Sequence, residues 1–306
     1  MIFPIFFGCL GNYTYFCSQI MLRTKKESFM NKKNRSMTTL KQWVLAAILI
    51  TSGASVFTGC TDSNGDNPVS ENNLSEKIIG KWIVADLNGV PAPTNQKTVL
   101  TFVSPTKAEG VVADCYGTAW NEDLSADVRI EGNKVTIMSR DVEERDHLVY
   151  MTVNSIDDKN MYMDFDWRIS ADGEIVFHDV TQDRWERVTA DYETDILCTW
   201  EGKRLNHESE FDDGKEHRWE FHDDGTYTFY NKVDGEWEAT DDVVSEYILD
   251  GTLLCTRWKA NGDGAKENRE WWEIESVENG VMKWKALRLR DDGTTYTANY
   301  ELAKVK

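Results

Sequence analysis

The stretch from Trp219 to Phe229, Trp-Glu-Phe-His-Asp-Asp-Gly-Thr-Tyr-Thr-Phe, predicts two β-strands and the turn between them. Trp219 and Phe221 alternate with polar residues, and Tyr227 and Phe229 do the same after the turn. A period of two places one row of side chains in a core and the other in water. The intervening Asp-Asp-Gly supplies the positive φ that a tight turn needs. The stretch therefore predicts an antiparallel hairpin with one buried face.

The same alternation recurs through the rest of the chain. Phe165, Trp167 and Ile169, for example, alternate with charged residues. Gly-containing turn signals separate such runs at 131–133, 172–173, 250–251, 278–280 and 292–293. No long apolar stretch with a period of 3.6 follows residue 60, which argues against the crossover helices of parallel sheets. The predicted fold class is therefore all-β and antiparallel.

The pattern occurs twice along the chain. Six landmarks appear in the same order in both halves, at offsets of 115 to 121 residues. They are Ile79–Trp82 with Leu197–Trp200, Leu100–Phe102 with Trp219–Phe221, Val128–Gly132 with Tyr247–Gly251, Ser155–Ile156 with Ser276–Val277, Met163–Phe165 with Met282–Trp284, and Trp185–Glu186 with Tyr300–Glu301. Self-similarity at a fixed offset is typical of a duplicated unit. The sequence predicts two domains, 74–188 and 192–306.

Each repeat has room for about eight strands, at roughly 14 residues for a strand and its turn. Eight antiparallel strands can close into a barrel whose interior holds core side chains or one small ligand. Closure also removes the exposed sheet edges that favour aggregation. The predicted architecture is thus two tandem up-and-down β-barrels of about eight strands each.

Three short motifs resemble the lipocalin-like domains of Bacteroidota lipoproteins. They are Gly80-Lys81-Trp82 on the first predicted strand, the Phe-x-x-Asp-Gly-Thr-Tyr-x-Phe of residues 221–229, and an aromatic-Glu pair on the closing strand of each repeat. The resemblance implies that an Arg from the last strand lies over the Trp of the first strand. Arg184 or Arg187 could take this position over Trp82.

The second repeat departs from this pattern. Cys198 stands where the first repeat has its glycine, and no Arg stands near Asn299 and Leu302. We therefore expect the end of the second barrel to be closed differently from the end of the first.

The N-terminal part predicts an export signal. An uncharged apolar run at 43–59 follows a group of basic residues, which is the order found in a signal peptide. The run ends in Phe57-Thr58-Gly59-Cys60, which resembles the lipobox of bacterial lipoproteins and implies that Cys60 is lipidated and becomes the first residue of the mature protein. An uncleaved anchor helix is the alternative, and the chain is membrane-tethered in either case.

The segments around this signal follow from it. We interpret 1–29 as a misassigned N-terminal extension, 30–59 as the lipoprotein signal peptide and 60–73 as a flexible tether. Asp62 and Asp66 in the tether resemble the export signal of surface lipoproteins in the Bacteroidota. We therefore expect a protein of the cell envelope that is lipid-anchored to the outer membrane and exposed at the surface.

The charge of the chain excludes one class of partner. The 306 residues include 34 Lys and Arg against 53 Asp and Glu, a formal net charge of -19. Loss of 1–59 removes seven basic residues and one acid, which leaves 27 against 52 and a net charge of -25. Such a surface repels nucleic acid and anionic lipid headgroups. The expected membrane attachment is therefore through the lipid alone.

Three cysteines remain outside the leader and the lipidation site, namely Cys115, Cys198 and Cys255. An odd number cannot pair completely. Cys198 and Cys255 belong to the same repeat, and they could form one disulfide or remain buried thiols.

The sequence contains no assembled catalytic or metal-binding motif. His217 and His222 are five residues apart and would lie on opposite faces of a strand, so we interpret the histidines as solvent-facing polar residues. Paired aspartates such as Asp223-Asp224 precede glycine and predict turns. Gly-x-Ser-x-Gly, a phosphate-binding loop and His-Glu-x-x-His are all absent. We predict that the protein is not an enzyme and that it uses no cofactor and no metal.

Aromatic side chains are the main binding candidates. Trp237 and Trp271 lie beside glutamates and are the candidates for surface contacts. The alternation predicts that the following residues line the barrel interiors: Trp82, Phe102, Met163, Phe165, Trp200, Phe221, Phe229, Trp272 and Trp284. The leading hypothesis is a non-enzymatic binding protein for a small hydrophobic ligand in one or both barrels. The alternative is a structural or adhesive surface module that binds a protein or glycan, and a hydrolase is a distant third.

Overall fold

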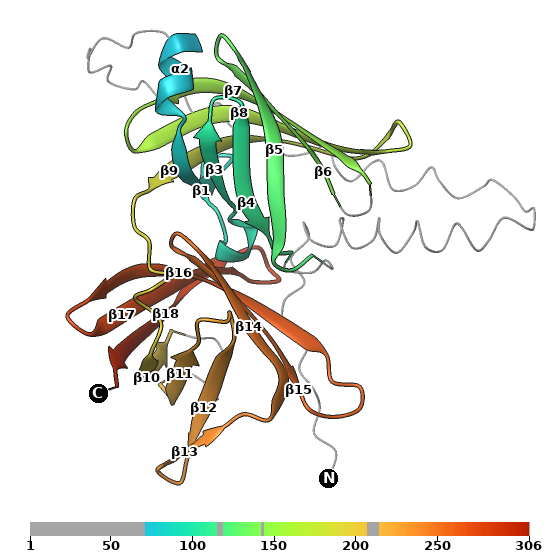
Figure 1. The fold of residues 1–306 in the computed structure, drawn as a ribbon. Coiled ribbons are helices and arrows are strands. Elements are labelled where there is room, and N and C mark those ends of the chain that lie inside the picture. Colours follow the sequence, from blue (N-terminus) through green and yellow to red (C-terminus); the bar gives the residue numbers. More distant parts are fainter. Residues whose placement is uncertain (1–70, 115–118, 142–143, 207–213, 306) are drawn as a thin grey trace, which may run out of the picture.

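The structure is a computed structural model that describes residues 71–114, 119–141, 144–206 and 214–305 (Figure 1). It contains two nine-stranded antiparallel sheets that follow one another along the chain. The signal peptide, Cys60 with its predicted lipid, the tether to residue 70 and Cys115 lie outside the described residues. Within the described part, no helix is long and apolar enough to cross a membrane.

The first sheet closes into a barrel. Its strands are β1 (Gly80–Leu87), β2 (Val90–Pro91), β3 (Val99–Ser104), β4 (Lys107–Val112), β5 (Glu122–Glu131), β6 (Lys134–Arg140), β7 (Asp146–Ile156), β8 (Asn160–Ala171) and β9 (Glu174–Val188). From β3 to β9 each strand pairs with its neighbour in sequence, and β9 then pairs with β1 from Lys81↔Val188 to Leu87↔Asp183. The short β2 is added at the end of β1. Eight strands therefore form the closed up-and-down barrel that the sequence predicted.

The second sheet follows the same plan but does not close completely. Its strands are β10 (Thr199–Leu205), β11 (Glu216–Phe221), β12 (Tyr227–Val233), β13 (Glu236–Ala239), β14 (Asp242–Asp250), β15 (Leu253–Ala260), β16 (Glu267–Glu278), β17 (Val281–Leu289) and β18 (Thr295–Lys304). β10 pairs with both β11 and β18, so β13 and β14 are the two edges. The all-β prediction is confirmed, but the second unit is a curled sheet with a gap between these edges.

The short strand β13 explains the gap. It pairs with β12 from Tyr230 to Val233 and so occupies the edge on which β14 would otherwise lie. The turn just before β12 contacts β14, through a bridge between Thr226 and Glu246 and a hydrogen bond of 2.8 Å from the Tyr247 N–H to the Gly225 carbonyl. The second unit is thus a curled half-barrel, whereas the first barrel is closed.

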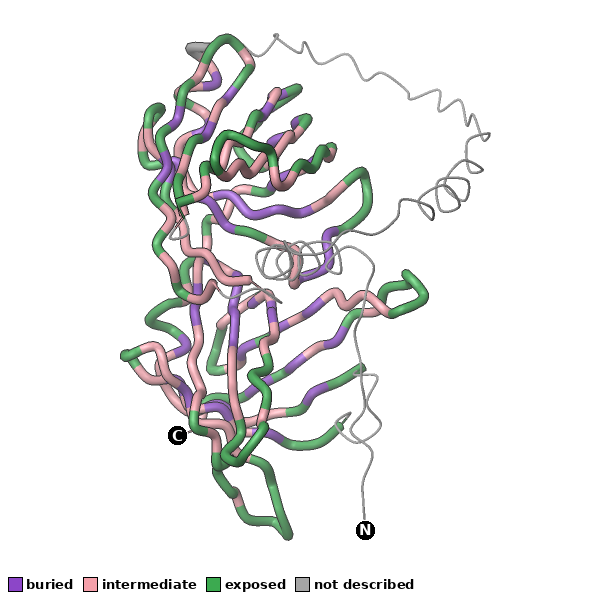
Figure 2. The backbone as a smooth tube through the Cα atoms, turned by 90° about the vertical axis from the view of Figure 1, so that its right-hand side faces the viewer, coloured by how far each residue is buried: buried purple, intermediate pink, exposed green. Residues whose placement is uncertain are grey.

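Each barrel has an apolar core built from the inward-facing positions of its strands. Buried residues lie along the strands, whereas the hairpin tips are exposed (Figure 2). The first core includes Trp82, Phe102 and Met163, and the second includes Trp272 and Trp284. Alternation of apolar and polar residues therefore places these side chains where the sequence predicted.

One end of the first barrel is closed by α2 (Glu71–Lys77) and by an arginine. The indole Nε1 of Trp82 donates a hydrogen bond of 2.7 Å to the Ile78 carbonyl. The guanidinium of Arg187 lies 4.2 Å from the centre of the Trp82 ring and donates to the carbonyls of Ile79 and Lys77. The structure thus confirms that an arginine from the last strand lies over the Trp of the first, and it is Arg187 that does so.

Gly80 is required at this end for two reasons. Its φ of +124° is one that residues with a side chain rarely adopt, and a Cβ here would lie 2.5 Å from Nη1 of Arg187. The second barrel differs as expected. Trp200 donates 2.9 Å to the Ile196 carbonyl, but the cation over its ring is the ammonium of Lys304, at 5.8 Å.

The two barrels pack against each other through a third apolar cluster. It joins Ile83 and Val99 of the first barrel to Ile248, Leu253 and Trp271 of the second. Ion pairs flank it, with Lys97 Nζ 2.7 Å from Glu273 Oε2 and Lys81 Nζ 2.6 Å from Asp250 Oδ1. The tandem units therefore share a buried contact.

One sequence prediction is corrected by this contact. Trp271 is only 2% exposed, so its expected surface position is wrong. Trp272 points into the second core, so its neighbour Trp271 points outward, where the first barrel covers it. Cys198 lies beside the second core and Cys255 lies in the cluster between the barrels, and no disulfide joins them.

Candidate functional site

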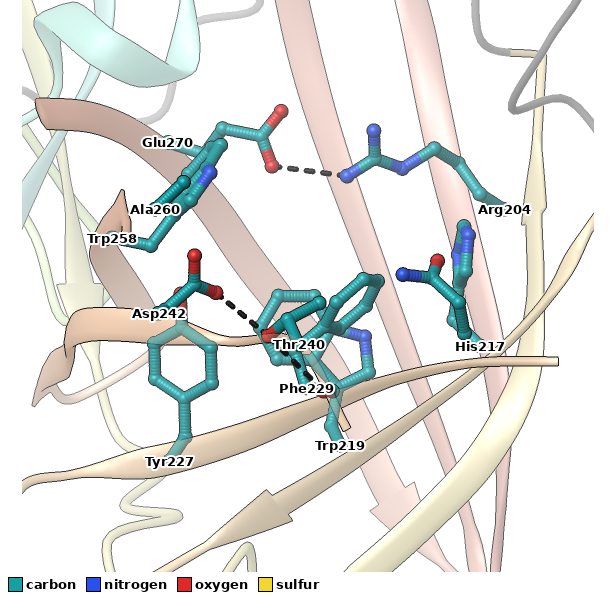
Figure 3. A pocket seen from close by; sticks show the side chains of 11 residues that line it. Arg204, His217, Trp219, Tyr227, Phe229, Thr240, Asp242, Trp258, Ala260 and Glu270 are labelled. Atoms are coloured by element: carbon teal, nitrogen blue, oxygen red, sulfur yellow. Dashed lines mark hydrogen bonds and ion pairs between the residues drawn. The ribbon is translucent and has the colours of Figure 1, made fainter. Parts of the chain in front are cut away.

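The candidate site is a pocket inside the second, incompletely closed barrel. It has a volume of about 240 Å³, and side chains from six strands and the β13–β14 connection line it (Figure 3). One wall is aromatic and consists of Trp219, Tyr227, Phe229 and Trp258. The other end is polar and charged. The pocket therefore offers an apolar surface and a polar end to one small molecule.

Strand alternation places the polar residues inside. Arg204 is four residues after Trp200 on β10, and His217 is two residues before Trp219 on β11. Both therefore face the interior, where Arg204 is 9% and His217 is 3% exposed. The expectation that His217 faces solvent is wrong, because it shares its face with Trp219.

An ion pair crosses the polar end of the pocket. Arg204 Nη2 lies 3.0 Å from Glu270 Oε2, and the indole N–H of Trp272 donates to the same oxygen at 3.2 Å. Arg288 Nη2 lies 3.8 Å from the other oxygen, Glu270 Oε1. The guanidinium carbons of Arg204 and Arg288 lie 5.3 and 4.7 Å from the centre of the Trp272 ring. Two guanidinium groups and one indole N–H thus surround one carboxylate.

Tyr300 extends this network. Arg204 Nε donates to the Tyr300 hydroxyl at 3.0 Å, and the hydroxyl lies 2.8 Å from His217 Nδ1. Burial raises the pKa of Tyr300, so the phenol keeps its proton at neutral pH. The Tyr300 hydroxyl thus links Arg204 to His217. The network thereby holds Arg204 in place beside the pocket.

The opposite side of the pocket lies at the gap between the edge strands. Thr240 Oγ1 donates to Asp242 Oδ2 at 2.7 Å and also lies 3.2 Å from the Phe229 carbonyl (Figure 3). Tyr227 is buried here, which raises the pKa of its hydroxyl. Because β12 and β14 form no ladder here, this wall of the pocket is made of side chains and not of paired backbone.

The predicted interior residues all belong to the two cores, but few of them reach the pocket. Phe229 lines it, whereas Trp82, Phe102, Met163 and Phe165 pack in the first barrel. Trp200, Phe221, Trp272 and Trp284 pack in the second. Their role in ligand binding stays a prediction.

Sequence reasoning missed the charged part of the site. Arg204 and Glu270 are 66 residues apart and meet only because the sheet curls. Trp237, the other surface candidate, is half-buried on β13, with Arg218 at 4.7 Å and Lys232 at 5.3 Å from its ring centre. Its role in partner contact stays a prediction. In the part of the chain that the structure describes, no group of three or more His, Cys, Asp or Glu could hold a metal ion.

Comparisons with solved structures give distant matches. No protein-family model matches the chain, and no curated protein matches it. A double mutant of the vaccine antigen Transferrin Binding Protein B from Haemophilus parasuis Hp5 matches with a TM-score of 0.24 and 9% identity, over 75% of this chain and 45% of that one. A single mutant of the same antigen matches with a TM-score of 0.21 and 10% identity, over 75% and 46%.

A third match is a protein of unknown function from the DUF3598 family of Nostoc punctiforme PCC 73102. Its TM-score is 0.19 at 9% identity, over 77% of this chain and 99% of that one. The chain spans less than half the length of the two Transferrin Binding Protein B chains. At these TM-scores the matches carry no argument about function, so the function is argued from the pocket.

Proposed function

We propose that this protein is a non-enzymatic binding protein, anchored to the outer membrane through a lipid on Cys60, that holds a small ligand in the pocket of its second barrel. The observation that carries this proposal is the pocket of about 240 Å³ with one aromatic wall and one charged end. Ligand sites are commonly apolar cavities with a few convergent polar groups. The described pocket has this composition.

The volume limits the size of the ligand. About 240 Å³ equals the liquid volume of roughly eight water molecules. It is also below the range of about 300 to 1,000 Å³ that is usual for sites of drug-sized molecules. A compact molecule fits inside, whereas a long-chain lipid would extend through the gap between β13 and β14.

The adhesive alternative has lost part of its basis. It requires exposed aromatic side chains, and Trp271 is covered by the contact between the barrels. Trp237 remains partly exposed, with the cations of Arg218 on β11 and Lys232 on β12 near its ring. A single aromatic residue of this kind supports the alternative less than the pocket supports ligand binding.

Mass spectrometry of molecules that co-purify with the full chain tests the proposal. The chain is purified gently from its native cells and compared with the same chain after unfolding and refolding without ligand. We expect a stoichiometric small molecule in the first sample only. The pocket-filling variant Ala260→Phe should lose it, whereas Ala303→Phe, a matched exposed alanine on the outer face of β18, should keep it. Equal occupancy in both variants would contradict binding in this pocket.

A further inference from the structure

Two carboxylates line the pocket, and they differ in their partners. Glu270 is balanced by basic groups, because Arg204 lies 3.0 Å from its Oε2 and Arg288 lies 3.8 Å from its Oε1. Asp242 forms no ion pair within the described residues, and its carboxylate accepts a hydrogen bond of 2.7 Å from Thr240 Oγ1. Arg204 is the only Lys or Arg among the described residues of the lining. No basic side chain of the lining thus balances the charge of Asp242.

Asp242 lies where a ligand can reach it. It is the first residue of β14, the edge strand beside the gap, and it pairs with Ala260 of the pocket wall. It is half-buried, and its second oxygen points away from Thr240 (Figure 3). A carboxylate has lone pairs for several donors. Asp242 therefore keeps acceptor capacity beside the pocket.

The aromatic wall suits a positively charged group. The face of an aromatic ring attracts a cation within about 6 Å of the ring centre. No Lys or Arg of the described chain lies in this way over the rings of the wall, which are Trp219, Tyr227, Phe229 and Trp258. The wall can therefore receive a cationic group of the ligand.

Tyr227 indicates the sign of the potential inside the pocket. Burial, and then the negative charges of Glu270 and Asp242, raise the pKa of its hydroxyl. Both carboxylates therefore act on the same point of the interior. A potential that disfavours the phenolate favours a bound cation.

We propose that the ligand is a compact protonated amine whose ammonium group donates to Asp242 and lies against the aromatic wall. This inference rests on the proposed function, because the pocket must first bind a ligand. A hydrogen bond between an ammonium group and a carboxylate is about twice as strong as one between neutral groups. Glu270 contributes less to this contact, because Arg204 and the Trp272 indole already donate to it.

Three probes of similar size test the ligand class. They are 2-phenylethylamine, which is cationic at pH 7, the neutral 2-phenylethanol and the anionic phenylacetate, each titrated into the full chain in lipid nanodiscs by calorimetry. We expect the amine to bind about ten- to a hundred-fold more tightly than the alcohol, because a hydrogen bond to a charged group contributes that much. Phenylacetate should bind most weakly, since Asp242 repels it.

Matched variants separate this contact from the overall charge and from misfolding. Asp242→Asn keeps the shape and can still accept from Thr240, so it should abolish the preference for the amine and leave the affinity for the alcohol unchanged. Asp241→Asn removes the same charge from the exposed neighbouring residue and should keep the preference. If Asp242→Asn fails to fold, the ratio of the affinities in the original chain still decides the ligand class.

The outcomes distinguish the two proposals. Equal affinities for the amine and the alcohol that are both lost in Ala260→Phe would overturn the cationic ligand and leave the binding function standing. A co-purifying molecule without a basic nitrogen would do the same. Absence of binding for all three probes, together with absence of a co-purifying molecule, would overturn the binding function and the ligand class with it. A preference for the amine that persists in Asp242→Asn would overturn the role of Asp242.

Discussion

The two barrels place different residues at the same position of the closing strand pair. In the first barrel, Asp183 of β9 pairs with Leu87 of β1. In the second, Tyr300 of β18 pairs with Arg204 of β10. The residues beside them on the previous strand differ as well, because Asp183 pairs with Met163 and Tyr300 pairs with Trp284. At this position the first barrel therefore has a single acid among apolar residues, whereas the second barrel has an ionic network.

The closed ends are more alike, although an arginine covers the Trp ring in the first barrel and a lysine in the second. Trp82 and Trp200 both donate to the carbonyl of the residue four positions earlier, and a cation from the last strand lies over each ring. The backbone hydrogen bonds of a barrel do not depend on which side chains fill its other end. The closed end therefore holds each barrel together, whereas the residues deeper in the interior can vary with the ligand.

The closed ends provide the largest predicted effect. Trp82→Ala and Trp200→Ala should each lower the free energy of unfolding by about 3 to 5 kcal/mol, because each removes a fully buried indole. Urea unfolding followed by far-ultraviolet circular dichroism measures this loss. The comparison predicts similar losses for the two variants. A loss in one barrel that is several-fold smaller would mean that the two ends are not equivalent.

The cations over the two rings should differ in their contribution. Arg187→Ala should lower the free energy of unfolding by about 2 kcal/mol or more, because it removes a ring contact at 4.2 Å and hydrogen bonds to the Ile79 and Lys77 carbonyls. Lys304→Ala should cost about 0.5 to 1 kcal/mol, since its side chain is exposed and 5.8 Å from the ring. The same urea experiment measures both, and equal costs would contradict the asymmetry.

The strand pattern and the first closed end could be predicted from the sequence. Alternation and Gly-containing turns are local signals. The lipocalin-like resemblance narrowed the cation over Trp82 to Arg184 or Arg187, and the structure selects Arg187. The sequence could also have predicted that His217 faces the barrel interior, because it lies two residues before Trp219 on the same strand. The pairing of Arg204 with Glu270 could not, since it depends on how far the second sheet curls.

The alternation of apolar and polar residues could not predict that Trp271 is buried. Period two assigns a side chain to a face of its own sheet, but it does not say whether another domain covers that face. The gap beside β13 has a similar origin. Whether β12 pairs with β13 or with β14 is a competition between two partners that alternation describes equally well.

Tyr300→Phe tests the ionic network at the compared position. The change leaves the ring in place but removes the oxygen that accepts from Arg204 Nε at 3.0 Å. We expect a loss of about 1 to 3 kcal/mol in the free energy of unfolding, because a charged donor loses an acceptor inside the barrel. Binding of the co-purifying small molecule should weaken in parallel, since Arg204, which lines the pocket, is no longer held by Tyr300. Loss of stability with unchanged binding would separate the network from the pocket.

Asp183→Asn tests the corresponding position of the first barrel and should have a small effect, with the opposite sign. Asp183 is 5% exposed, Trp185 Nε1 donates to its Oδ2 at 3.1 Å, and its Oδ1 has no hydrogen-bond partner within the described structure. Burial raises the pKa of Asp183. Removing the charge should therefore stabilise the protein at pH 7, by about 1 kcal/mol.

The sign of its pH dependence follows from the raised pKa. Near pH 3 the Asp183 carboxyl is mostly protonated in both the folded and the unfolded chain, so the variant and the original chain should be similarly stable. As the pH rises, the unfolded chain loses this proton first, and the original chain loses stability until the folded carboxyl ionises as well. Urea midpoints measured from pH 3 to 7 should thus diverge in favour of Asp183→Asn. A difference that is the same at every pH would mean that the buried acid is not what distinguishes the first interior from the second.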